Sequence, residues 1–178
     1  MLTKGYTYEV LNNFKKVVIK AARANLTRKD KIVSKGLYES LQGEVEVMPN
    51  SFYMSLSMED YGEYQDKGVS GTEKKYNTPY SYSSRSNLIG LEYHSGIFAK
   101  WARFRGMQPR LANGRFGSYK TMGFILANSI KKKGIKPSLF FTKPFEAAFK
   151  NLPEELIEEY GLDVDDLMAT VLKAQKTK

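Results

Sequence analysis

The chain contains a single histidine, His94, and histidine is the most common general base at neutral pH. A Ser/His/Asp arrangement would need partners from elsewhere in the chain to orient the imidazole and to exchange its proton. The surrounding run Tyr93-His94-Ser95-Gly96 is irregular and fixes no such partner. A lone histidine in such a context is more often a surface or packing residue. The sequence therefore predicts no catalytic residue and no enzymatic activity.

Metal and phosphate chemistry have equally little support. The chain has no cysteine, so no thiolate zinc site can form, and one histidine excludes a zinc site built on several. Asp163, Asp165 and Asp166 offer oxygen ligands for Mg²⁺, but helix capping explains carboxylates at a helix start. The glycine-containing run 114–118 lacks the Gly-Lys-Ser/Thr ending of a phosphate-binding loop. We expect no metal and no cofactor.

Binding chemistry is better represented, in a segment that interleaves arginine with aromatic residues. Aromatic rings can stack bases while guanidinium groups hold phosphates, so residues 98–120 are a candidate nucleic-acid surface. The same composition is typical of protein interfaces, and no known nucleic-acid module accompanies it. We therefore favour a protein interface and keep nucleic-acid binding as the alternative. The candidate contact residues are Tyr80, Tyr82, Trp101, Arg103, Phe104, Arg105, Arg110 and Phe116.

The net charge of +9 is unevenly distributed, with a basic body in residues 1–150 and an acidic end in residues 151–178. A basic surface attracts nucleic acid by counterion release, and it equally meets an acidic protein neighbour. The opposite charges of body and end suggest head-to-tail pairing between copies. No apolar run approaches the roughly 20 residues that cross a bilayer, and residues 1–5 lack a secretory signal. No membrane contact is expected.

Hydrophobic periodicity predicts the elements of the first sixty residues. Apolar residues recur at helical spacing over 8–26, with lysines mostly on the opposite side, which predicts an amphipathic helix. A short helix containing Leu37, Tyr38 and Leu41 follows. Strict alternation on both sides of the turn pair Pro49-Asn50 predicts a β-hairpin over 44–59 with one buried face.

Residues 69–117 show little periodicity and are dense in Gly, Ser, Asn, Tyr and Arg. Such a long segment is rarely idle loop in a compact domain, and its many aromatic residues argue against simple disorder. We predict an extended arm or large loop at about 69–117 that becomes ordered against a partner.

The remaining elements are predicted mainly from breakers and caps. Residues 118–133 form a helix that Gly134 ends, and Leu139-Phe140-Phe141 is expected to form a short strand. Pro144 suits the first turn of the next helix. A further helix begins at Pro153 and ends at Gly161, and Asp163 is expected to cap a last one.

These elements predict an α+β fold, in which the N-terminal helix and the central 118–133 helix pack on a small antiparallel sheet. The expected division is one α+β domain over 1–152, with the arm inserted at about 69–117, and an acidic helical segment over 153–178.

The order of elements and two short motifs resemble the tail-completion, or minor tail, proteins of lambdoid and related bacteriophages. The first motif is Tyr61-Gly62-Glu63-Tyr64-Gln65-Asp66-Lys67-Gly68, directly after the hairpin. The second is the proline-and-aromatic stretch 136–145, which leads into a helix. In both, the matching residues have structural roles: the tyrosines place rings on a sheet and the prolines bracket a strand. They are Tyr61, Tyr64, Gly68, Pro137, Phe140, Pro144 and Phe145.

The resemblance implies a structural virion protein rather than an enzyme. It implies a neck or tail-completion ring of six or twelve copies that connects the portal or head–tail adaptor to the tail, with DNA passing through the lumen. The implied partners are copies of this chain, the portal or adaptor and tail proteins, with transient non-specific DNA contact. The implied location is the virion neck or tail, after synthesis in the bacterial cytoplasm. The segment 69–117 is longer and more basic than the corresponding loop of the family.

Overall fold

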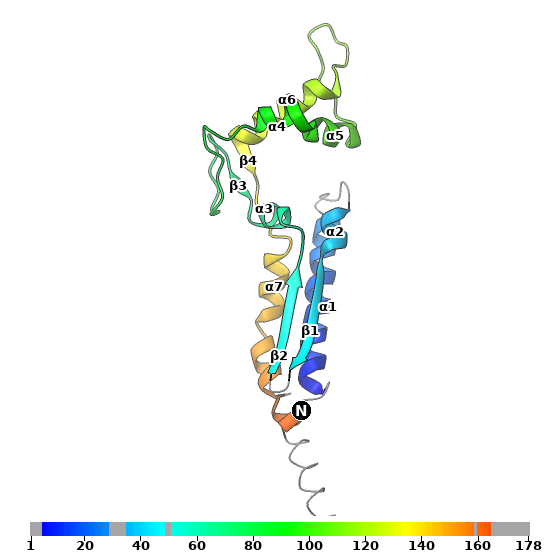
Figure 1. Ribbon diagram of the computed structural model, residues 1–178, viewed down its shortest axis with the longest axis vertical. Coiled ribbons are helices and arrows are strands. Elements are labelled where there is room, and N and C mark those ends of the chain that lie inside the picture. The colour runs from blue at the N-terminus through cyan, green and yellow to red at the C-terminus, as the bar shows by residue number, and fades with distance from the viewer. Residues whose placement is uncertain (1–4, 29–34, 49–50, 159, 165–178) are drawn as a thin grey trace, which may run out of the picture. The chain divides into compact units, whose positions relative to one another are not determined.

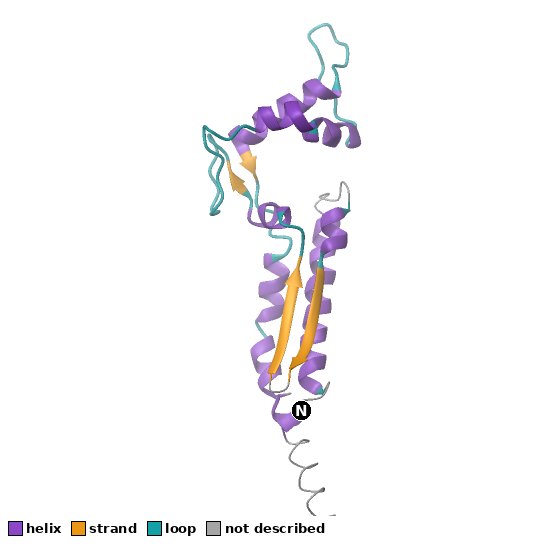
Figure 2. Ribbon diagram, in the orientation of Figure 1, coloured by secondary structure: helices purple, strands orange, loops and turns teal. Residues whose placement is uncertain are grey.

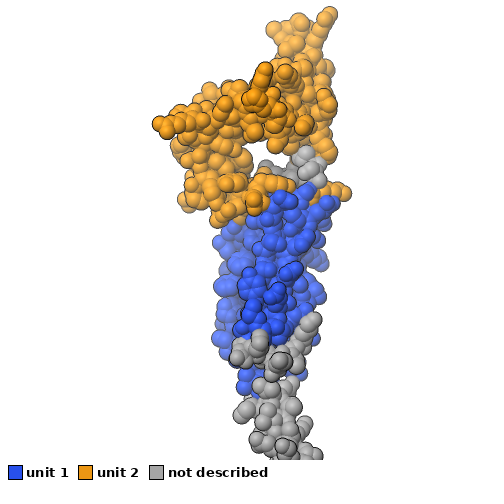
Figure 3. Space-filling view, in the orientation of Figure 1, with its two compact units in different colours: residues 1–28, 36–59, 140–178 blue, residues 29–35, 60–139 orange. Residues whose placement is uncertain are grey.

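The computed structural model describes residues 5–28, 35–48, 51–158 and 160–164. The chain divides into two compact units (Figure 3). Unit 1 comprises residues 1–28, 36–59 and 140–178, and unit 2 comprises residues 29–35 and 60–139. This division differs from the expected one, because the middle of the chain forms a unit of its own and is not a loop inserted in a single domain.

Unit 1 is built around the β-hairpin (Figure 1). Helix α1 (Tyr6–Arg28) is followed by α2 (Gly36–Ser40), and strands β1 (Gln42–Met48) and β2 (Ser51–Ser57) pair antiparallel. The register places Val45 opposite Met54 and Val47 opposite Phe52. The N-terminal helix and the hairpin are therefore confirmed, while the turn pair 49–50 lies outside the described residues.

The core of unit 1 joins α1, β2, α7 (Thr142–Phe149) and the helical residues that follow α7. Phe14, Val18 and Leu152 form the buried centre of this core. Each helix and the hairpin bury one apolar face there, because an amphipathic element must cover that face with another element. The Phe145 ring packs edge-on against Phe14, with centroids 5.6 Å apart. Helix α7 confirms the expectation that Pro144 lies in the first turn of a helix. The partly buried hydrophobic residues around the centre are Val10, Met54, Leu56, Phe141, Phe145, Ala148 and Leu156.

After α7, residues 152–158 and 160–164 are helical, and we call residues 152–158 the acidic helix. Residues 160–164 are helical on both sides of Gly161, where a helix end was expected, and the last expected helix lies almost wholly outside the described residues. The Asp163 carboxylate accepts hydrogen bonds from the backbone N–H groups of Tyr6 and Thr7, each 2.9 Å long. These are orphan donors at the start of α1, where Gly5 has no side chain that could cap the helix.

Within its described residues, unit 2 contains α3 (Tyr61–Lys67), three further helices and a small two-stranded sheet (Figure 2). Helices α4 (Leu88–Ser95) and α5 (Ile97–Phe104) pack against α6 (Tyr119–Lys133). Strand β3 (Val69–Ser70) pairs antiparallel with β4 (Gly134–Ile135). The expectation of an extended arm over 69–117 is wrong for residues 88–104, which are helical and packed.

A buried carboxylate joins the three packed helices of unit 2. Glu92 is only 3% exposed, and it accepts hydrogen bonds from the N–H groups of Phe98 (2.7 Å) and Ala99 (3.0 Å). It therefore caps the first turn of α5 from the preceding helix. Gly123 of α6 lies against the same carboxylate, so closely that a methyl group added there would collide with it.

Two local expectations from the sequence are wrong. Residues 61–67 form helix α3 and not a strand, so Tyr61 and Tyr64 do not place rings on a sheet. Residues 139–141 form a turn and not a strand, and Leu139 has φ 48°. The α+β class is confirmed by the mixture of helices and antiparallel pairs. The helix beside α1 in the hairpin unit is α7, whereas α6 packs within unit 2.

Candidate interaction surfaces

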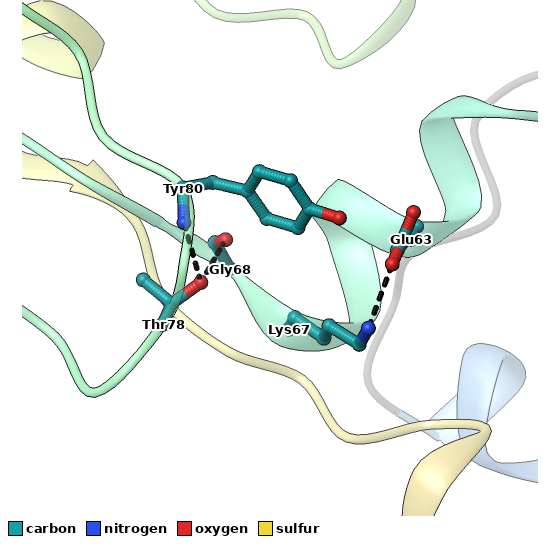
Figure 4. A network of polar contacts seen from close by, with 5 residues as sticks. All are labelled: Glu63, Lys67, Gly68, Thr78 and Tyr80. Carbon is teal, nitrogen blue, oxygen red and sulfur yellow. Dashed lines mark hydrogen bonds and ion pairs between the residues drawn. The ribbon is translucent and has the colours of Figure 1, made fainter.

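The first motif lies at the junction of α3 and β3 (Figure 4). Lys67 forms an ion pair with Glu63 one helical turn earlier, at 2.7 Å. The Thr78 hydroxyl donates to the Gly68 carbonyl at 2.9 Å and accepts from the Tyr80 N–H at 3.4 Å. These contacts fasten the loop after β3 onto α3.

Tyr80 is held in this junction by its ring and its hydroxyl. Its ring lies edge-on to that of Tyr64, with centroids 4.7 Å apart. A hydrogen bond to the Glu63 carboxylate raises the pKa of Tyr80, while hydrogen bonds from Lys67 and Tyr80 lower the pKa of Glu63. Tyr82 is partly buried, which raises its pKa, and its N–H donates to the Ser70 carbonyl at 2.8 Å. Both tyrosines, expected to contact a partner, are thus largely engaged inside unit 2.

The structure brings the two motifs together within unit 2. The Ser138 hydroxyl donates to the Gln65 carbonyl at 2.6 Å, and the N–H groups of Ser138 and Leu139 donate to the Asp66 carbonyl. Gly68 has φ 77°, and a Cβ there would lie 2.6 Å from the Pro137 nitrogen. Glycine is therefore required at this position by both backbone conformation and space. The motif residues Phe140, Pro144 and Phe145 lie in unit 1, where Phe140 is fully buried.

The arginine and aromatic residues of unit 2 form pairs with one another. Arg105 lies 5.8 Å from the Trp101 ring centroid, Arg110 lies 5.2 Å from that of Phe116, and Arg103 lies 5.6 Å from that of Tyr119. A short bridge between Arg110 and Phe116 closes the turn that carries the second pair. Cation–π contact of this kind occupies ring faces that would otherwise be open to bases.

Large apolar side chains remain exposed around these pairs. Phe104 and Phe116 are 67% and 63% exposed, although both are phenylalanines with no polar group to solvate. Ile89, Leu91, Ile97 and Ile125 of the same unit are also exposed. Single exposed apolar residues are ordinary, and unit 1 exposes others, so it is the exposure of two whole phenylalanine rings that favours a protein interface here.

Unit 1 carries a second surface of different chemistry, which we call the basic groove. It is an open groove of about 560 Å³ between α1 and α2. Arg23 is fixed at one wall, because its guanidinium donates to the carbonyls of Tyr38 (3.1 Å) and Leu41 (2.9 Å) and lies over the Tyr38 ring. The residues that line the basic groove are Lys15, Lys16, Ile19, Lys20, Arg23, Ala24, Thr27 and Tyr38.

The basic groove was only partly foreseeable from sequence. Helical periodicity places the lysines opposite the buried residues of α1, as expected. The wall formed by Tyr38 depends on how α2 packs against α1, and no local sequence pattern predicts this packing. Lys15, Lys16 and Lys20 form no ion pair with any acidic residue among those described.

His94 lies exposed on α4, in edge contact with the Tyr93 ring at 5.3 Å. Within the described ranges, no three His, Cys, Asp or Glu side chains gather as a metal site would require. None of the helices in those ranges is both long and apolar enough to cross a bilayer.

No protein-family model, no curated protein and no solved structure matches this chain.

Proposed function

We propose that this chain is a structural subunit of a bacteriophage neck or tail-completion ring. In this role it would join the portal or head–tail adaptor to the tail by contacts with copies of itself and with neighbouring virion proteins. The observation that carries the proposal is the exposure of large apolar rings on unit 2, above all those of Phe104 and Phe116. Their burial against a partner would be favourable at about 25 cal/mol per Å².

The contact between the two family-like motifs supports the same proposal. Residues 61–68 and 136–139 are far apart in sequence, yet Ser138 and Leu139 are hydrogen-bonded to Gln65 and Asp66. The residues that carry the resemblance thus have a shared structural role. The proposal assigns no catalytic step to the chain, and a His94→Ala variant is expected to assemble normally.

Disruption of the gene in its phage or prophage tests the proposal. Electron microscopy of the lysate should show DNA-filled heads and separate tails, because the joining ring is missing. Supplying the protein from a plasmid should restore joined particles, and supplying the His94→Ala variant should restore them equally. Normal joined particles without the protein would overturn the proposal.

Nucleic-acid binding is the second candidate, and the basic groove favours it. Three lysines without described ion-pair partners lie beside the anchored Arg23. A phosphate backbone in the groove would release counterions, so affinity would fall steeply as salt rises. The Arg/aromatic pairs of residues 98–120 could add base contacts only by opening ring faces that arginine now covers.

A titration with duplex and single-stranded DNA at two salt concentrations separates the two functions. A DNA-binding protein should bind with submicromolar affinity, and a Lys16→Glu/Lys20→Glu variant should lose most of it. The slope of log K against log salt should shrink by about one for each lysine removed. A ring subunit should instead bind weakly and without sequence preference, and the double variant should still join heads to tails.

A further inference from the structure

Helix α5 exposes a continuous stripe on the side away from its packing contacts. Ile97, Lys100, Trp101 and Phe104 are spaced i, i+3, i+4 and i+7, which places them on one side of a helix. Ile97 is 52% exposed, Trp101 is 36% exposed and Phe104 is 67% exposed. The buried residue of the helix, Ala102, lies on the other side. This stripe, which we call the α5 stripe, is apolar with one cation at its margin.

The acidic helix of unit 1 exposes a stripe with the same geometry and the opposite charge. Glu154, Ile157 and Glu158 share one side of this helix by the same spacing rule. Ile157 is 76% exposed, the most exposed large hydrophobic residue among those described.

The other side of the acidic helix is already occupied. Leu152 is buried and Leu156 packs against the core of unit 1. The packing of unit 1 therefore fixes which side of the helix is left outward.

We infer that the α5 stripe of one copy docks onto the acidic helix of a second copy. Ile157 matches Ile97 and Phe104 in apolar character, and it lies on the outward side of its helix as they do on theirs. Glu154 and Glu158 match Lys100 in charge, which orients the two helices. Within the described ranges, none of these three charged groups forms an ion pair inside its own chain.

The interface joins two unlike surfaces, so it is heterologous and each copy has one free surface of each kind. Such contacts extend from copy to copy and close into a ring when the rotation divides a full turn. The inference rests on the proposed ring function and names the two surfaces that build it. A single helix pair buries less area than a standard interface, so weak association, with Kd of about 1 to 100 µM, is expected for the free chain.

Sedimentation of the full chain over this concentration range tests the docking. The parent chain should associate progressively, and Phe104→Glu or Ile157→Glu should each remain monomeric, because a charge enters an apolar contact. Both positions are solvent-exposed in the single chain, so both variants should fold, as circular dichroism would verify. Ile125→Glu, at an exposed position of α6 outside both stripes, is the matched control and should associate like the parent.

Mixing the two monomeric variants gives the sharper result. The Phe104→Glu chain retains an intact acidic helix and the Ile157→Glu chain retains an intact α5 stripe. An equimolar mixture should therefore form dimers and nothing larger, since only one productive contact exists between them. A mixture that stays monomeric, or a parent chain that stays monomeric throughout, overturns the inference.

Charge reversal checks the orientation. Lys100→Glu and Glu158→Lys should each weaken association at least fivefold, and the chain with both changes should recover most of it. If the double variant is no better than the single ones, the proposed pairing of charges is wrong. These solution measurements do not depend on the virion. If heads and tails join without the protein, the ring function is wrong, but the interface between copies is still supported by the association data.

Discussion

At the scale of single residues, Asp163 stabilises a helix that begins 157 positions earlier in the sequence. Partial burial would raise the pKa of this carboxyl, but hydrogen bonds from Thr7 and Tyr6 outweigh that effect and hold the pKa below its ordinary value. The favourable interaction is therefore with the charged form, as expected for a carboxylate at the positive end of a helix.

Replacing Asp163 by alanine is expected to destabilise unit 1 by about 1 kcal/mol, the usual cost of losing a helix cap. Asp163→Asn is the graded comparison and should cost less, because its amide oxygen can still accept one of the two N–H bonds. Urea denaturation followed by helical circular dichroism measures both. An alanine variant as stable as the parent at neutral pH would show that the cap contributes nothing.

The same residue predicts a pH dependence with a defined sign. A carboxyl whose pKa is lower in the folded than in the unfolded chain stabilises the fold above its unfolded pKa of about 4. That contribution is lost as pH falls through the lower folded pKa. The stability difference between the parent and Asp163→Ala should therefore be full at pH 7 and shrink below about pH 4. A difference that stays constant to pH 2 would contradict the assignment.

At the scale of elements, the Glu92 cap is expected to contribute to the stability of α5 where it packs on α4 and α6. Its removal in Glu92→Ala leaves two buried N–H groups of α5 without an acceptor, which costs about 1 to 3 kcal/mol. Glu92→Gln keeps an acceptor and should cost less.

Hydrogen exchange of the α5 amides is the most direct measurement of this cap. The exchange should accelerate strongly in Glu92→Ala and only slightly in Glu92→Gln. Equal acceleration in both variants would mean that the charge, and not the acceptor, holds the turn. Gly123→Ala provides an independent check, since its methyl group would push the same carboxylate aside.

The elements differ in how well the sequence predicts them. Helix α1 and the hairpin were predictable because each buries one side against a single layer, so the period shows in the sequence. Helix α5 was not predicted, because it has only eight residues and lies within a segment rich in Gly, Ser and Asn, although Lys100 and Arg103 share one of its sides. The spacing of Tyr61 and Tyr64 favours ring positions on a sheet, whereas residues 61–67 form helix α3.

The candidate contact residues were predictable to a similar degree. The composition of residues 98–120 correctly drew attention to Phe104 and Phe116, which are exposed. It could not show that the Tyr80 ring packs against Tyr64, because that contact joins a loop to a helix that the pattern did not predict. The role of Asp163 likewise depends on which distant helix end lies beside it.

At the scale of the whole molecule, the division into two units predicts that their stabilities can be changed separately. Leu56 packs against the core of unit 1, so Leu56→Asp should cost several kcal/mol by placing a charge among apolar side chains. Amide exchange should then accelerate across α1, β1 and β2. Protection of α4, α5 and α6 should change much less, and their equal loss would show that the two units unfold as one.

The discontinuity of unit 1 also dictates an order of folding during translation. Residues 60–139 leave the ribosome as one uninterrupted stretch, and their helices contact near neighbours in sequence, which favours rapid folding. Helix α1 emerges much earlier, yet its core partners in α7 and its cap at Asp163 are synthesised only after unit 2 is complete. The hairpin can cover part of the apolar side of α1 soon after synthesis, but the part that packs against α7 stays exposed in the nascent chain, where it is a target for chaperones that bind exposed hydrophobic segments.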